Sequence, residues 1–196
     1  AYNSYIERTK SMYENQSLSP ENVFRDSVQA VMSQNHPKKR PMTDKLLDEA
    51  DYMETYKIFK NRFGDPGNFT FFFVGNIDSK ESKELIEKYL GGLPKVGRDE
   101  KWKDNNIRPP KGKVSKFVNK GKDQKSIVLM NLHGKVDYNW KNKLELNAIS
   151  KVLSTKLLES IREDKSGVYS ISAYPQMLEL PESRYNVIIY FGCSPD

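Results

Sequence analysis

The chain has 196 residues, of which 37% are hydrophobic and 30% are charged, and its mean hydropathy is −0.75. A chain of this length buries about 70% of its unfolded surface, so it can fold without disulfide or metal staples. One cysteine and two histidines exclude an internal disulfide framework and a zinc site made of four Cys and His ligands. No apolar run is long enough for a transmembrane helix, so we expect no membrane span.

The net charge of +6 comes mainly from lysine. Arginine, with its planar fork, is favoured in nucleic-acid sites, whereas lysine mostly solvates surfaces. The densest basic stretch, residues 111–125, offers only Phe117 as a ring on which a base could stack. A solvated rim is therefore the favoured interpretation, and we expect no nucleic-acid partner. A lysine-rich nucleic-acid-binding domain is kept as a third alternative, which steep salt-dependent binding would support.

The first part of the chain has helical patterns. Residues 1–35 predict a helical lead-in, in which Ser19 and Pro20 form a typical helix start. Thr43 opens a longer predicted helix that runs to about Phe63 with an apolar stripe on one face.

The next segments predict a strand and a helix. Residues 69–74 are an apolar run with one threonine, which is typical of a strand buried on both faces. A helix that Asp78 or Ser79 can cap then continues to about Leu90.

The second half of the chain combines strands with one long helix. Strands are predicted at 114–118 and 126–132, and the longest helix at 137–161, where apolar residues recur every three or four positions. Two more strands are predicted at 168–174 and 185–191. This order predicts an α+β fold, a two-layer sandwich of one mixed or antiparallel sheet with helices packed on one face.

Generic motifs identify no complete active site. A metallopeptidase helix needs H-E-x-x-H or H-x-x-E-H, and neither occurs in the sequence. His36 precedes a proline and His133 lies at a predicted strand end, so both are interpreted as surface or capping residues. Cys193 is interpreted as a small buried apolar residue. We therefore expect no metal ligand and no catalytic residue in this chain.

Two ordered blocks carry a resemblance to a known family. The first is Phe-Thr-Phe-Phe-Phe-Val-Gly-Asn-Ile-Asp at 69–78, with a helix that ends in Leu-Gly-Gly-Leu-Pro at 90–94. The second is the long helix that ends at Arg162, followed by a polar turn with Gly167 and then Tyr169. Over roughly residues 20–196 the chain resembles the insulinase/pitrilysin family of zinc peptidases, the family with the inverted H-x-x-E-H motif.

The resemblance implies a specific half of such a peptidase. Family members have two similar halves that close around a substrate chamber; the first carries the zinc, and the second supplies an arginine and a tyrosine. This sequence lacks the zinc motif but keeps Arg162 and Tyr169 at the family's spacing, so it resembles the second, zinc-free half. The implied fold is a metallohydrolase half-domain like that of mitochondrial processing peptidase. Arg162 and Tyr169 would bind substrate and support the transition state, with zinc only in the partner half.

The implied organisation is a single half-domain over residues 1–196, with a helical lead-in at 1–35 and a core at 36–196. Relative to the family, segments are expected to be missing at both ends. The implied partners are a zinc-bearing half, in the same chain or in a separate subunit, and a peptide or unfolded polypeptide substrate. This fragment alone is expected to be inactive.

Two alternatives stay open from the residues. The chain could be a non-catalytic structural or partner subunit of a peptidase-like complex. Arg162 could simply cap the end of its helix while Tyr169 packs beside Ile171 and Ala173. For location, the polar, lysine-rich surface favours the periplasm or cell envelope over the cytoplasm.

Overall fold

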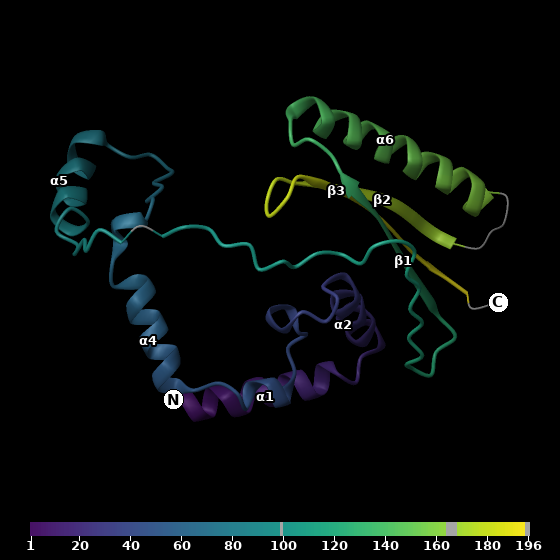
Figure 1. The fold of residues 1–196 in the computed structure, drawn as a ribbon, viewed down its shortest axis with the longest axis horizontal. Helices are drawn as coiled ribbons and strands as arrows, with labels where there is room; N and C mark the ends of the chain where they lie inside the picture. The colour runs from purple at the N-terminus through teal and green to yellow at the C-terminus, as the bar shows by residue number, and fades with distance from the viewer. Residues whose placement is uncertain (99, 164–167, 195–196) are drawn as a thin grey trace. The chain divides into compact units, whose positions relative to one another are not determined.

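The computed structural model describes residues 1–98, 100–163 and 168–194, without the side chains at 162–163 and 168–170 (Figure 1). The chain divides into two compact units, Ala1–Lys120 (unit 1) and Gly121–Asp196 (unit 2). In the described part of the chain, no helix combines the length and apolarity that crossing a membrane requires.

Unit 2 contains an antiparallel sheet with the strand order β1-β3-β2. Its strands are β1 (Ser126–Lys135), β2 (Val168–Leu178) and β3 (Arg184–Cys193). Both outer strands pair with β3, so a hairpin joins β2 to β3 and the connection through α6 joins β1 to β2. The three strands predicted in this part of the sequence are confirmed, and each extends beyond its predicted bounds.

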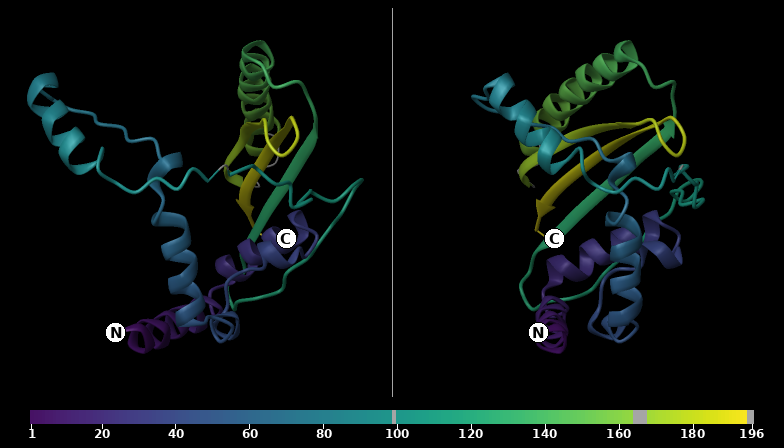
Figure 2. Two further views of the ribbon diagram at one scale, coloured as in Figure 1. Left: turned by 60° about the vertical axis from the view of Figure 1, so that its left-hand side comes forward. Right: turned by 90° about the vertical axis from the view of Figure 1, so that its left-hand side faces the viewer.

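Helix α6 (Trp140–Leu158) lies over one face of this sheet (Figure 2). It begins three residues later than predicted because the Asn139 side chain accepts the backbone N–H of Asn142 at 2.8 Å and so caps the helix there. The apolar core lies between α6 and the sheet. Its buried members are Ile171, Ala173, Val187 and Ile189, and partly buried residues packed against them include Leu146, Leu153, Leu157, Leu158 and Ile161. This helix-on-sheet arrangement confirms the predicted α+β class.

The buried face of α6 differs from the predicted one by part of a turn. The apolar repeat at 137–161 includes Ile149 and Val152 and predicts that they face inward, but their side chains are 62% and 61% exposed. Ser150 is only 1% exposed and lies on the same face as Leu146 and Leu153. A small side chain at this position lets the helix come close to the sheet, so packing distance rather than hydrophobicity alone selects the face.

Unit 1 is built from helices joined by turns. Its elements are α1 (Tyr2–Gln16), α2 (Pro20–Met32), η1 (Pro37–Lys39), α3 (Asp44–Leu47), α4 (Tyr52–Phe63), η2 (Pro66–Asn68) and α5 (Ser79–Tyr89). Side-chain oxygens of Ser19, Thr43, Asp51 and Asp78 accept backbone N–H groups at the starts of α2, α3, α4 and α5. The helix starts predicted at Ser19, Thr43 and Asp78 are therefore confirmed.

The single helix predicted from Thr43 to Phe63 is wrong, because the chain forms α3 and α4 with a break between them. At the break, Asp51 Oδ1 accepts the Glu54 N–H at 2.6 Å and starts a new helix. The turn before it is held by ion pairs of Asp48 with Lys10 and of Glu49 with Arg40.

Two predicted strands are also absent from the described structure. Residues 69–74 and 114–118 are not in any β-ladder, and Phe72, Val74 and Phe117 are 84%, 96% and 87% exposed. Apolar composition favours an extended backbone, but a strand is stable only when a neighbouring strand pairs with its N–H and C=O groups. Here that partner is lacking among the described residues, so the prediction of a strand buried on both faces fails.

The α6 packing leads to a paired prediction. Ser150→Leu should lower the free energy of unfolding by about 1–3 kcal/mol, because the larger side chain does not fit the close approach of α6 to the sheet. Ile149→Ser, one residue away on the exposed side, should change it by less than about 0.5 kcal/mol. Urea unfolding followed by the circular dichroism of the chain measures both. A larger loss for Ile149→Ser than for Ser150→Leu would contradict the assigned face.

Candidate functional site

The two residues predicted to face a substrate lie on consecutive elements of unit 2. Arg162 lies in a π-helical turn, Glu159–Glu163, that continues from α6, and Tyr169 is near the start of β2. This turn contacts β2. The side chains of both residues, and residues 164–167 between them, lie outside the described part of the structure. The predicted convergence of the guanidinium and the phenol therefore stays a prediction.

The backbone at Tyr169 has an irregular register. Val168 pairs with Cys193 and Ile171 pairs with Phe191, so β2 contains one extra residue between these two pairs. An extra residue on one strand of an antiparallel pair is a β-bulge, which bends the strand and changes the direction of the side chains within it. The backbone of Tyr169 lies inside this irregular segment.

The turn with Arg162 is held against the strand with Tyr169. Ile161, next to Arg162, packs against the cluster that includes Ile171. Earlier in the chain, within α6, the Ser154 hydroxyl accepts the backbone N–H of Ala173 at 2.9 Å. These contacts join α6 and its final turn to β2 by both apolar packing and a hydrogen bond, and they place the backbones of Arg162 and Tyr169 at one end of the unit.

The described residues contain no group of three or more His, Cys, Asp or Glu side chains that could hold a metal ion. His36 Nδ1 accepts the Lys38 N–H at 3.2 Å and caps the short η1 turn, which confirms its interpretation as a capping residue. His133 lies within β1, opposite Asn186, rather than at the strand end. The His36 side chain is thus used as a helix cap, and His133 is a residue of the sheet, so neither histidine belongs to a metal-binding group among the described residues.

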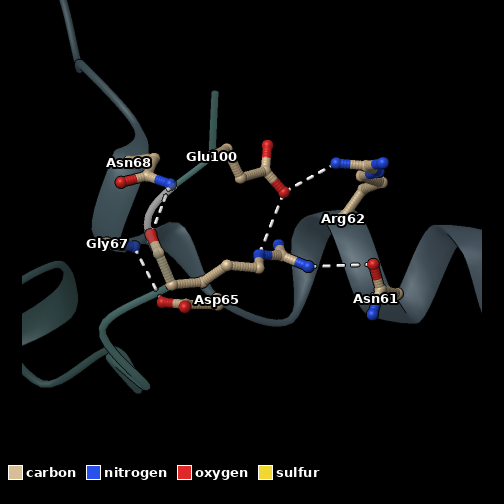
Figure 3. Close-up of polar contacts among 7 residues, drawn as sticks. Asn61, Arg62, Asp65, Gly67, Asn68 and Glu100 are labelled. Carbon is tan, nitrogen blue, oxygen red and sulfur yellow. Dashed lines mark hydrogen bonds and ion pairs between the residues drawn. The ribbon is translucent and has the colours of Figure 1, made fainter. Parts of the chain in front are cut away.

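A polar cluster that the sequence analysis missed lies where α4 ends in unit 1 (Figure 3). The buried Asp65 accepts the Gly67 N–H through Oδ1 at 3.0 Å. This hydrogen bond is the main reason that the pKa of Asp65 lies below its ordinary value; the backbone N–H groups of Val96 and Arg98 lower it further, against the opposing effect of desolvation. The carboxylate is therefore stabilised in its ionised form by backbone donors from two segments.

Charged side chains extend this cluster. Arg98 donates to Asn61 Oδ1 at 2.8 Å and pairs with Glu100 at 3.0 Å, and Glu100 also pairs with Arg62 at 2.6 Å (Figure 3). The sequence does not predict this cluster, because its second half lies some thirty residues after Asp65 and nothing in the spacing indicates the contact.

Comparison with known families identifies the domain. The family model described as "Peptidase M16 inactive domain" matches residues 54–196, which is most of the chain. The chain belongs to the M16 inactive-domain family. The resemblance to the insulinase/pitrilysin zinc peptidases, and specifically to their inactive half, is thereby confirmed.

Two curated relatives of this M16 domain are named as zinc proteases. "Zinc protease PQQL-like" of Arabidopsis thaliana is 36% identical over 76 residues, which cover 39% of this chain and 8% of the relative. "Probable zinc protease PqqL" of Haemophilus influenzae is 25% identical over 132 residues, which cover 67% of this chain and 14% of the relative. The M16 chain thus spans a small part of the length of these proteins.

Two solved structures share the fold. The periplasmic protease PqqL from Escherichia coli matches with a TM-score of 0.79 at 18% identity, over 99% of this chain and 21% of that one. A mutant of the ferredoxin protease FusC, in complex with Arabidopsis ferredoxin, matches with a TM-score of 0.70 at 14% identity, over 93% and 20% of the two chains. At these identities the likeness establishes the fold.

The Asp65 carboxylate makes a pH-dependent contribution to stability that can be tested. Its pKa is lower in the folded chain than in the unfolded one, so its contribution is complete above the ordinary aspartate pKa of about 3.9 and is lost as the pH falls through the lowered folded value. The stability difference between the wild-type chain and Asp65→Asn should therefore be largest near neutral pH and shrink in acid. Urea unfolding at a series of pH values, with an NMR titration of the Asp65 carboxyl, measures both quantities. A carboxyl that titrates at or above its ordinary pKa would contradict this assignment.

Proposed function

We propose that this M16 domain is the zinc-free, C-terminal-type half of a zinc metallopeptidase, in which Arg162 and Tyr169 bind the peptide and support the transition state at the zinc site of a partner half. One observation carries the proposal. The helical turn with Arg162 is packed on β2, and the β-bulge that contains Tyr169 follows at the start of that strand. Bulges are frequent next to active sites, where they re-aim a side chain.

The chemistry of the two side chains suits this function. When bound in the partner half, the zinc ion supplies an activated water for peptide hydrolysis. As negative charge develops on the scissile carbonyl oxygen, the Arg162 guanidinium and the Tyr169 phenol donate hydrogen bonds to that oxygen or to its neighbours. Arginine and tyrosine side chains ordinarily titrate well above neutral pH, so this function uses them as hydrogen-bond donors rather than in proton transfer.

The partner half lies in the same polypeptide or in a separate subunit, and the substrate is a peptide or an unfolded polypeptide. Support for a protein substrate comes from the structural relative FusC, a ferredoxin protease solved in complex with Arabidopsis ferredoxin. The structural relative PqqL from Escherichia coli is a periplasmic protease, which supports a location in the periplasm or cell envelope. On this proposal residues 1–196 belong to one half-domain, with residues 1–35 as a helical lead-in and 36–196 as its core.

The alternative is that the chain is a non-catalytic partner subunit. The presence or absence of a zinc-bearing half distinguishes it from the peptidase. An H-x-x-E-H motif in the same polypeptide or in a co-purifying subunit supports the peptidase. If neither contains that motif, the subunit alternative is favoured.

The first prediction of this proposal concerns Tyr169 in the complete zinc enzyme. Tyr169→Phe removes one hydrogen-bond donor and keeps the ring, so kcat should fall by about 10²–10³ while the melting temperature stays unchanged. Tyr174→Phe is a matched control, because Tyr174 is an exposed tyrosine of the same strand and its hydroxyl should not matter for activity.

Arg162 provides the second half of this test. Arg162→Lys keeps the charge but loses the planar fork, so it should also lower kcat. If both side chains act on the same substrate oxygen or its neighbours, the effects in the double variant should be non-additive. Wild-type kcat/KM in Tyr169→Phe, with only a small loss of stability in Arg162→Lys, would instead indicate that Arg162 caps the helix and that Tyr169 is a packing residue.

A further prediction concerns the metal. The isolated 196-residue chain should retain no zinc after dialysis and should not hydrolyse peptides, because its histidines and cysteine cannot assemble three or four convergent ligands. Elemental analysis and a quenched-fluorescence peptide assay measure these properties. One tightly held zinc ion per chain would overturn the assignment to the zinc-free half.

A further inference from the structure

Within unit 1, residues 69–95 form an excursion that begins after the η2 turn and returns to that turn. At the point of return, the Asn68 side chain donates through Nδ2 to the backbone C=O of Arg98 at 2.8 Å. The two ends of this excursion, which contains α5, are therefore joined at their base (Figure 3).

The base is closed by more than one contact. Asp65 Oδ1 accepts the Gly67 N–H before the excursion at 3.0 Å, and the backbone N–H groups of Val96 and Arg98 after it help to lower the pKa of the same carboxylate. The Arg98 guanidinium also donates to Asn61 on α4 at 2.8 Å. Side chains and backbone groups from before the excursion thus hold residues that follow it.

The close approach at the base also accounts for a glycine. A Cβ atom on Gly67 would lie 3.0 Å from Asp65 Oδ1 and 3.0 Å from Lys95 Cγ. Any larger residue at this position would have to displace the Asp65 and Lys95 side chains. The absence of a side chain at Gly67 lets the two chain segments meet at this separation.

We propose that Asp65, Asn68, Val96 and Arg98 form a clasp that closes the base of the excursion and opens or closes as one cooperative unit. Closing a long loop has an entropic cost, and contacts at its two ends are the ones that offset it. The excursion includes the exposed apolar run at 69–74, so the clasp determines whether this run and α5 are held at a fixed base or released as an open loop.

Amide hydrogen exchange of the 196-residue chain, resolved by residue with NMR, tests the clasp. The Val96 and Arg98 amides should be protected in the wild-type chain. Asp65→Ala should speed their exchange by about tenfold, the scale for one hydrogen bond. Asn68→Ala leaves the Asp65 carboxylate in place, yet it should speed exchange of the same two amides, because a cooperative clasp opens when either side is weakened.

The matched control is Asp78→Ala, which removes an aspartate that also accepts two backbone N–H groups but lies within the excursion. It should speed exchange of the Lys80 and Glu81 amides and leave Val96 and Arg98 unchanged. The clasp is refuted if Val96 and Arg98 are unprotected in the wild-type chain, if Asn68→Ala leaves their exchange unchanged, or if Asp78→Ala has the same effect on them. If the Asp65→Ala chain loses its helical circular dichroism, it is unfolded and is left out. The exchange rates in Asn68→Ala and Asp78→Ala then test the clasp.

Discussion

The packing of α6 on β2 is the contact on which the arrangement of unit 2 depends. Apolar side chains from the helix cover Ile171 and Ala173, and the Ser154 hydroxyl accepts the N–H that Ala173 directs away from β3. An outer strand otherwise presents unpaired N–H groups, so one helix both buries the core and occupies a donor at the sheet edge. Because the helix is fixed in this way, the turn that follows it is fixed beside the start of β2.

The elements that the sequence predicted correctly depend on local interactions. The starts of α2 and α5 follow from Ser19 and Asp78, whose side chains bond to backbone groups only a few residues away. The strands of unit 2 contain β-branched and aromatic residues and pair with one another in an antiparallel sheet. The failed strand at residues 69–74 has an equally strong composition, but a strand exists only with a partner, and composition does not specify one.

In the candidate site, too, local sequence features could be predicted and contacts between distant segments could not. The spacing of Arg162 and Tyr169 is a property of the sequence, and it led to the family of zinc peptidases that the comparisons confirm. The bulge at the start of β2 could not be predicted, because register is a relation between two strands. The cluster around Asp65 was missed for a similar reason, since its donors come from both sides of a long excursion.

The central claim is that this domain contributes Arg162 and Tyr169 to a reaction centre whose metal lies in another half. The most direct measurement is a crystal structure of the complete zinc enzyme with a phosphinate peptide, whose tetrahedral oxygens imitate the transition state. The account predicts the Tyr169 hydroxyl and the Arg162 guanidinium about 2.7–3.1 Å from those oxygens or from the adjacent peptide groups. A bound phosphinate with both side chains directed away from it, Arg162 on the carbonyls of its own helix and Tyr169 packed against the sheet, would contradict it.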